Sequence, residues 1–116
     1  MPKRRDWERA GDIVEAIGRF KVYTRGYTYS KFLSDSKTQD AIVRNLEIIG
    51  EAAKNISGEF RKKHRAIDWK NIAGMRDRLI HEYFGVNWEI VWDVATLKLP
   101  QLESTLRKLL HEREHR

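Results

Sequence analysis

The residues best suited to chemistry lie close together in one short stretch of this chain. Arg76, Asp77, His81 and Tyr83 supply a permanent positive charge, a carboxylate, an imidazole and a phenol. An imidazole can move a proton to or from a ribose 2′-hydroxyl or a leaving oxygen near neutral pH. A guanidinium offers a rigid fork of N–H donors that stabilises charge on phosphorus oxygens. An imidazole together with a guanidinium is what RNA cleavage without a metal ion requires.

The spacing of apolar residues predicts that this stretch ends a helix over residues 69–84. Arg76 then lies inside the apolar stripe of the helix, where an unpaired charge is costly. Asp77 and His81 would be neighbours one turn apart, so the carboxylate could orient the imidazole. His81 lies roughly 140° round the helix from Arg76, so a site that uses both needs another helix or another chain. The stripe is formed by Trp69, Ile72, Ala73, Leu79, Ile80 and Tyr83.

Spacing alone is also compatible with purely structural roles for these residues. Arg76 could pair with a core carboxylate such as Glu47 or Glu51, with His81 at the surface. Residues 111–115 spell H-E-x-x-H, but a catalytic zinc needs a third protein ligand and a shaped cleft, and this copy lies in a terminal helical turn. The chain has no cysteine and no glycine-rich phosphate loop, so we expect neither a metal nor a cofactor.

The composition is that of a small helical domain. The 116 residues are 41% hydrophobic and 34% charged, and we predict one domain over residues 1–116. No apolar run approaches the ~20 residues that span a bilayer, so we expect a cytoplasmic protein without a membrane partner. The net charge of +6 suits a polyanion such as RNA, but also an ordinary solubilising surface. The basic run at residues 61–65 is either a solvated connector or a phosphate contact.

Helical periodicity dominates the chain, and no strand signature is visible. Ser36 and Gln39 have the spacing of a capping box, Asp68 and Asn87 are good N-caps, and Gly85 suits the left-handed residue after a helix. This predicts an all-α, antiparallel, up-and-down bundle of four to five helices. The predicted helices are residues 6–23, 36–57 and 69–84, one that follows the Asn87 cap and runs to about residue 99, and one that begins at Pro100 and ends in the turn at 111–115. Short helices or turns are predicted at 27–34 and 59–64.

Four residues separate Arg76 from His81, and one residue separates His81 from Tyr83. This motif resembles the signature of HEPN-superfamily ribonucleases, specifically the HepT toxin family. An Asn or Asp commonly follows the arginine in that superfamily, and Asp77 matches. The likeness continues outside the motif, in residues 38–53, 68–75, 86–92 and 99–102.

This resemblance implies an HEPN-like helical homodimer in which two catalytic helices face each other across a cleft. It also implies a metal-independent endoribonuclease toxin, with Arg76 and His81 catalytic and Asp77 supporting. The antitoxin of such a system is an MNT-type nucleotidyltransferase that AMPylates the motif tyrosine, here Tyr83. The expected partners are therefore RNA, a second copy of the chain and this antitoxin, with a larger hetero-oligomer as a further option.

A second hypothesis belongs to a different class. The chain could be a non-catalytic helical-bundle module that binds a nucleotidyltransferase and presents a substrate to it. The intact motif at Arg76 and His81 favours the ribonuclease hypothesis.

Overall fold

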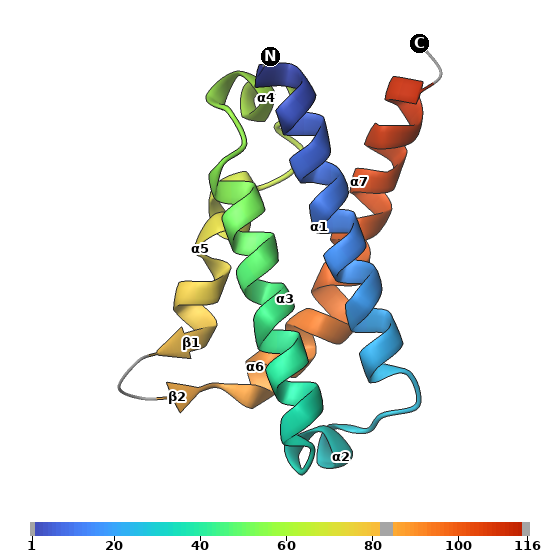
Figure 1. Ribbon diagram of the computed structural model, residues 1–116, viewed down its shortest axis with the longest axis vertical. Helices are drawn as coiled ribbons and strands as arrows, with labels where there is room; N and C mark the ends of the chain where they lie inside the picture. The colour runs from blue at the N-terminus through green and yellow to red at the C-terminus, as the bar shows by residue number, and fades with distance from the viewer. Residues whose placement is uncertain (1, 82–84, 115–116) are drawn as a thin grey trace.

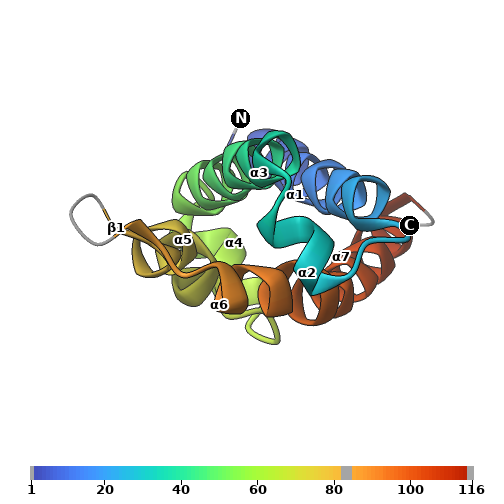
Figure 2. The same ribbon diagram turned by 90° about the horizontal axis from the view of Figure 1, so that it is seen from below.

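Two long antiparallel helices, α1 (Pro2–Thr24) and α3 (Ser36–Lys54), lie side by side and form one side of the bundle (Figures 1 and 2). The computed structural model describes residues 2–81 and 85–114. Each helix buries an apolar stripe with helical spacing, so the two stripes pack against each other. The fully buried side chains of these helices include Ile13, Ile17, Phe20, Ile42, Leu46 and Ile49.

The short helix α2 (Tyr29–Leu33) closes one end of the bundle (Figure 2). The Thr28 hydroxyl caps it by accepting from the Lys31 N–H. Phe32 is buried, and its ring packs against Trp88 and Trp92, at centroid distances of 5.6 and 5.0 Å. One aromatic side chain therefore fixes α2 to the later part of the chain.

The start of α3 differs from the predicted capping box. Asp35 is the N-cap, because its carboxylate accepts from the Thr38 N–H at 3.2 Å, and Ser36 becomes the first helical residue. Gln39 does not turn back to the cap; its amide donates to the carbonyls of Phe32 and Leu33 at 3.1 Å. A carboxylate one position upstream therefore displaces the predicted serine cap.

The predicted end of the second helix is also wrong by a few residues. α3 ends at Lys54, and Ser57 is the N-cap of α4 (Gly58–Lys63), the turn predicted at residues 59–64. The buried Asp6 carboxylate accepts from the Ser57 N–H at 2.9 Å and from its hydroxyl at 2.6 Å. These bonds tie the beginning of α1 to the beginning of α4.

The helix predicted over residues 69–84 is shorter in the structure. α5 (Trp69–Leu79) is followed by the strand β1 (Ile80–His81), which pairs antiparallel with β2 (Gly85–Val86). The Asn87 N–H donates to the Leu79 carbonyl at 3.2 Å, and Ile80 and Val86 both pack against the core. This pairing satisfies the backbone where the helix would have continued, so tertiary context overrides the helical pattern.

The last two predicted helices are joined into one bent rod. Asn87 caps α6 (Trp88–Asp93), the π-helical segment η1 (Val94–Lys98) follows, and α7 (Leu99–Glu114) completes the rod. In η1, the Leu99 N–H donates to the carbonyl of Val94, five residues back. Pro100 has no N–H and its ring crowds the preceding turn, which favours a widened turn at this point.

The all-α bundle is confirmed, with the β1–β2 pair as a small addition that the sequence pattern did not indicate. Seen end-on, α1, α3, α5, α6 and α7 surround the core (Figure 2). Glu103 of α7 is buried and pairs with Lys21 of α1, which adds an ion pair between these two helices. In the part of the chain that the structure describes, no helix is long and apolar enough to cross a bilayer.

Candidate active site

Arg76 lies in the last turn of α5, on the side that faces α3. The Asp68 carboxylate starts α5 by accepting from the Asn71 N–H at 3.1 Å. The two helices approach closely at Gly50, where an added Cβ would lie 3.6 Å from the Ala73 carbonyl oxygen and 3.7 Å from the Arg76 Cβ. The absence of a side chain at Gly50 thus brings the surface of α3 directly under Arg76.

Two carboxylates flank the Arg76 guanidinium. Nη2 lies 3.7 Å from Oε1 of Glu47, and Nη1 lies 3.6 Å from Oδ1 of Asp77. Both distances exceed the usual hydrogen-bond range, so these carboxylates compensate the charge without occupying the N–H donors. The Arg76 side chain is 42% exposed and that of Glu47 is 40% exposed, so the pair lies at the rim of the bundle. Of the two predicted core partners for Arg76, Glu47 is thus a neighbour, but it is not a core residue.

His81 lies on β1 rather than on the helix of Arg76. Its backbone pairs with Gly85, and nothing is described of its side chain. The prediction that Asp77 and His81 are neighbours one turn apart on a helix is therefore wrong, because the helix ends at Leu79. Asp77 is instead a neighbour of the Arg76 guanidinium. Tyr83, the predicted modification site, lies outside the described residues.

Arg76 lines a shallow hollow of about 200 Å³ between α3 and α5. Its charged lining consists of two cations, Lys54 and Arg76, and three carboxylates, Glu47, Glu51 and Asp77. The described lining of one chain thus has a small anionic excess. Binding of a phosphate here requires further positive charge from outside this lining.

The basic run at residues 61–65 is only partly a surface feature. The Arg61 guanidinium turns inward and donates to the Ala53 carbonyl near the end of α3, at 2.7 Å. Lys62, Lys63 and Arg65 are exposed, and Lys63 pairs with Glu59 at 3.6 Å. Arg61 therefore has a structural role, and the other cations remain on the surface.

The H-E-x-x-H pattern falls at the end of α7, with His111 and Glu112 exposed and His115 outside the described residues. Among the residues that the structure describes, no three or more His, Cys, Asp or Glu side chains are grouped to hold a metal ion.

Comparison with known proteins identifies the family. The profile described as Ribonuclease HepT-like matches residues 13–109, which include α5 and the Arg76–His81 motif. The chain belongs to the Ribonuclease HepT-like family. This confirms the resemblance seen in the sequence, and it shows that the likeness extends beyond the motif, from the middle of α1 to near the end of α7.

Several relatives of this HepT-like chain carry ribonuclease names. The chain is 44% identical over 107 residues to "Probable ribonuclease HepT" of Thermococcus cleftensis, covering 92% of this chain and 97% of the relative. It is 40% identical over 114 residues to a "Putative RNase" of Methanocaldococcus jannaschii, covering 98% and 94%. A third, a "Putative RNase" of Caldanaerobacter subterraneus, is 49% identical over 88 residues, covering 76% and 79%. No solved structure matches the chain significantly.

Proposed function

We propose that this HepT-like protein is a metal-independent endoribonuclease and the toxin of a toxin–antitoxin pair. The observation that carries the proposal is the Arg76 guanidinium, which lies half-exposed in a hollow with its N–H donors unoccupied by the flanking carboxylates. Such a group can bind a phosphate bidentately. The family membership and the ribonuclease names of the relatives support RNA as the source of that phosphate.

Each motif residue then has a definite task. Arg76 binds the scissile phosphate and stabilises the negative charge that grows on its oxygens in the transition state. His81 transfers a proton between the 2′-hydroxyl, the leaving 5′-oxygen and solvent. Asp77 keeps the guanidinium near the hollow, because it lies beside Nη1 of Arg76.

The complete site forms between two copies of the chain. The hollow in one chain has more carboxylates than cations, so it does not by itself attract a polyanion. In the homodimer, a second copy would bring its His81 to the hollow that holds Arg76 of the first. The homodimer cleft therefore supplies the second catalytic group that this hollow lacks.

Neutralisation by an MNT-type nucleotidyltransferase, which the family resemblance implies, agrees with the same electrostatics. AMP carried by Tyr83, close in sequence to His81, would add phosphate charge near Arg76, where it would occupy the anion site and repel RNA. Mass spectrometry of the chain after incubation with such an enzyme and ATP tests this step. AMP transfer to a chain that never cleaves RNA would favour the substrate-presenting module instead.

The catalytic assignment is tested with Arg76→Ala and His81→Ala. Each should lower the rate of RNA cleavage by about 10²- to 10⁴-fold, the usual contribution of a proton-transfer group or a transition-state charge partner. Cleavage of a fluorescent oligoribonucleotide by purified protein, with EDTA present, is the measurement.

Arg78→Ala is the matched control for Arg76→Ala. Arg78 is an exposed arginine of the same helix, and its guanidinium donates to the Asn71 carbonyl at 2.8 Å, away from the hollow. This variant should cleave RNA at nearly the wild-type rate. Wild-type rates in a folded Arg76→Ala/His81→Ala double variant would show that another site, or a contaminating nuclease, does the chemistry.

A further inference from the structure

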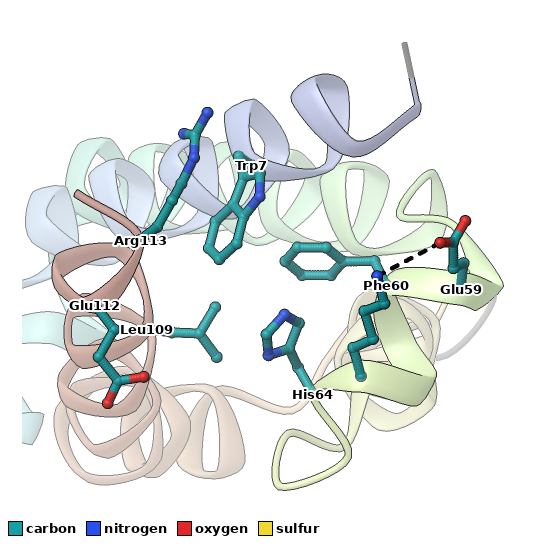
Figure 3. A pocket seen from close by; sticks show the side chains of 8 residues that line it. Trp7, Glu59, Phe60, His64, Leu109, Glu112 and Arg113 are labelled. Carbon is teal, nitrogen blue, oxygen red and sulfur yellow. Dashed lines mark ion pairs between the residues drawn. The ribbon is translucent and has the colours of Figure 1, made fainter. Parts of the chain in front are cut away.

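The beginning of α1 and the end of α7 lie at the same end of the bundle (Figure 1). A second hollow, lined by aromatic rings, lies there (Figure 3). Its volume is about 360 Å³, within the usual range for binding sites of small organic groups. It takes no part in the function proposed for Arg76. The walls are Trp7, Phe60, His64 and Leu109, and the rim carries Glu59, Lys63, Glu112 and Arg113.

The aromatic walls are held in place by the core. Phe60 packs edge-on against Trp7 at a centroid distance of 5.0 Å, and against His64 at 4.5 Å. Phe60 is itself buried on Trp69, whose indole N–H donates to the His64 carbonyl at 3.0 Å. Trp7 is half-buried, and in Figure 3 its ring, the imidazole of His64 and Leu109 converge on the hollow. A flat ligand would thus meet surfaces that need little ordering.

Two cations and two carboxylates lie at the rim beside these rings. The Arg113 guanidinium lies over the Trp7 ring at 5.1 Å, and Lys63 is at the rim. Lys62 and Arg65 are exposed on the same segment as Lys63. Rim carboxylates partly offset this charge, so the hollow is not a simple anion site. The hollow offers a ligand aromatic rings for stacking, with cations beside them.

We propose that this hollow binds one base of a single-stranded RNA, with the adjoining phosphates on Lys62, Lys63 and Arg113. Aromatic rings beside positive charge are the combination that binds single-stranded nucleic acid through its bases and backbone. Adenine offers a larger stacking face than uracil, so it binds better between these rings. This inference rests on the proposed function, because it takes RNA as the substrate.

The hollow would make a second contact with the RNA, away from the point of cleavage. Arg76 is seven residues beyond Trp69 on α5, so it lies about 10 Å further along the helix. The Trp69 ring packs against Phe60, which lines the hollow. A base held near Trp7 would therefore influence which RNA is retained without touching the scissile phosphate.

The experiment measures binding separately from cleavage. The Arg76→Ala chain is titrated with short fluorescent oligoadenylate and oligouridylate, with AMP as competitor and inorganic polyphosphate as a polyanion without bases. Adding Trp7→Leu, which keeps apolar bulk but removes the stacking ring, should weaken oligoadenylate binding about tenfold or more. Polyphosphate binding should be unchanged, and AMP should displace the oligoadenylate.

Two further variants keep the outcome clear. Trp92→Leu is the matched control, because Trp92 is also half-buried and stacked on a phenylalanine, but far from the hollow in sequence and outside its lining. It should leave oligoadenylate affinity unchanged. Arg113→Gln removes an exposed cation beside the Trp7 ring, and should weaken oligoadenylate binding several-fold.

Equal oligoadenylate affinity with and without Trp7→Leu would overturn the proposal. So would binding of AMP without binding of the oligonucleotide, since the ligand would then be a free nucleotide. If Trp7→Leu lowers the melting temperature strongly, the Arg113→Gln variant decides: an unchanged oligoadenylate affinity overturns the proposal. The ribonuclease function fails separately, if the wild-type chain binds oligoadenylate in this way but cleaves no RNA.

Discussion

Arg76 shows how a charged residue can interrupt an apolar helical stripe at a modest cost. The helix ends three residues later, so the side chain emerges at the rim and is not enclosed by the core. Glu47 from α3 and Asp77 from its own helix compensate the charge. The position of Arg76 in the apolar stripe correctly indicated an anionic neighbour, but it predicted a side chain more buried than the one observed.

Asp35 is another residue whose surroundings stabilise its charge. The Tyr27 hydroxyl donates to it at 2.6 Å, and the Thr38 hydroxyl and N–H donate at 2.8 and 3.2 Å. These bonds, with the Tyr27 bond contributing most, lower the pKa of Asp35 from 3.8 to about 2. The charged carboxylate therefore joins the end of the α1–α2 connection to the start of α3.

The lowered pKa predicts a pH dependence of stability. Since the folded chain holds the Asp35 proton less tightly than the unfolded chain, the contribution is complete above pH about 4 and is lost as the pH falls towards about 2. Asp35→Asn keeps a capping side chain but removes the charge. It should destabilise the protein at pH 7, and its difference from wild type should shrink through that acid range in urea unfolding.

Tyr27→Phe provides the control for this pH dependence. It removes the strongest partner, so an NMR titration should show the Asp35 pKa rising towards its ordinary value. A stability difference that stayed constant from pH 7 to pH 2 would mean that Asp35 acts only as a neutral cap.

At the scale of elements, the change from α5 to the β1–β2 pair matters most for the site, because it moves His81 off the helix of Arg76. Gly85, opposite His81, has a φ of +79°, in the left-handed region that disfavours side chains. Gly85→Ala should therefore cost about 1 kcal/mol and also slow RNA cleavage, by disturbing the strand that carries His81.

Gly26→Ala is the matched control for the glycine of β2. Gly26 has a φ of +74° and, like Gly85, has open space where a Cβ would be. It should lower the melting temperature by a similar amount and leave cleavage unchanged. If both variants cleave RNA like wild type, the conformation of Gly85 does not influence His81.

Sequence periodicity was sufficient to predict the helices and several of their caps. Asp68 and Asn87 cap their helices as predicted, because an N-cap depends on residues within one turn. The end of α5 was not predictable in this way, since Ile80 and His81 fit a helix until Val86 and Gly85 pair with them. The hollow at Trp7 had no linear signal either, because His64 is far from Trp7 in sequence and meets it only in the fold.

At the scale of the whole molecule, the proposed shared site makes a prediction about mixtures. Arg76→Ala and His81→Ala chains, each inactive alone, should regain activity when unfolded together and refolded. In a heterodimer, one site would receive Arg76 from one chain and His81 from the other. Random pairing of equal amounts would then restore about a quarter of the wild-type rate.

The control is the same mixture with both substitutions placed on one of the chains. If each site takes Arg76 and His81 from different chains, a heterodimer of the double variant and a wild-type chain has no site with both residues. Only wild-type homodimers would then cleave RNA. Absence of recovery in the first mixture, with a dimer seen by analytical ultracentrifugation, would instead place both residues of each site on one chain.

The bonds between Asp6 and Ser57 have a consequence for the order in which the chain assembles. They join residues that are both synthesised before α5, and α1, α3 and α4 together bring much of the core. Because a single domain generally folds as a unit, these bonds become stable only when α5, α6 and α7 have also been made. Arg76 reaches its place beside Glu47 in that same step. During synthesis, the capacity to cleave RNA would be among the last properties that the protein acquires.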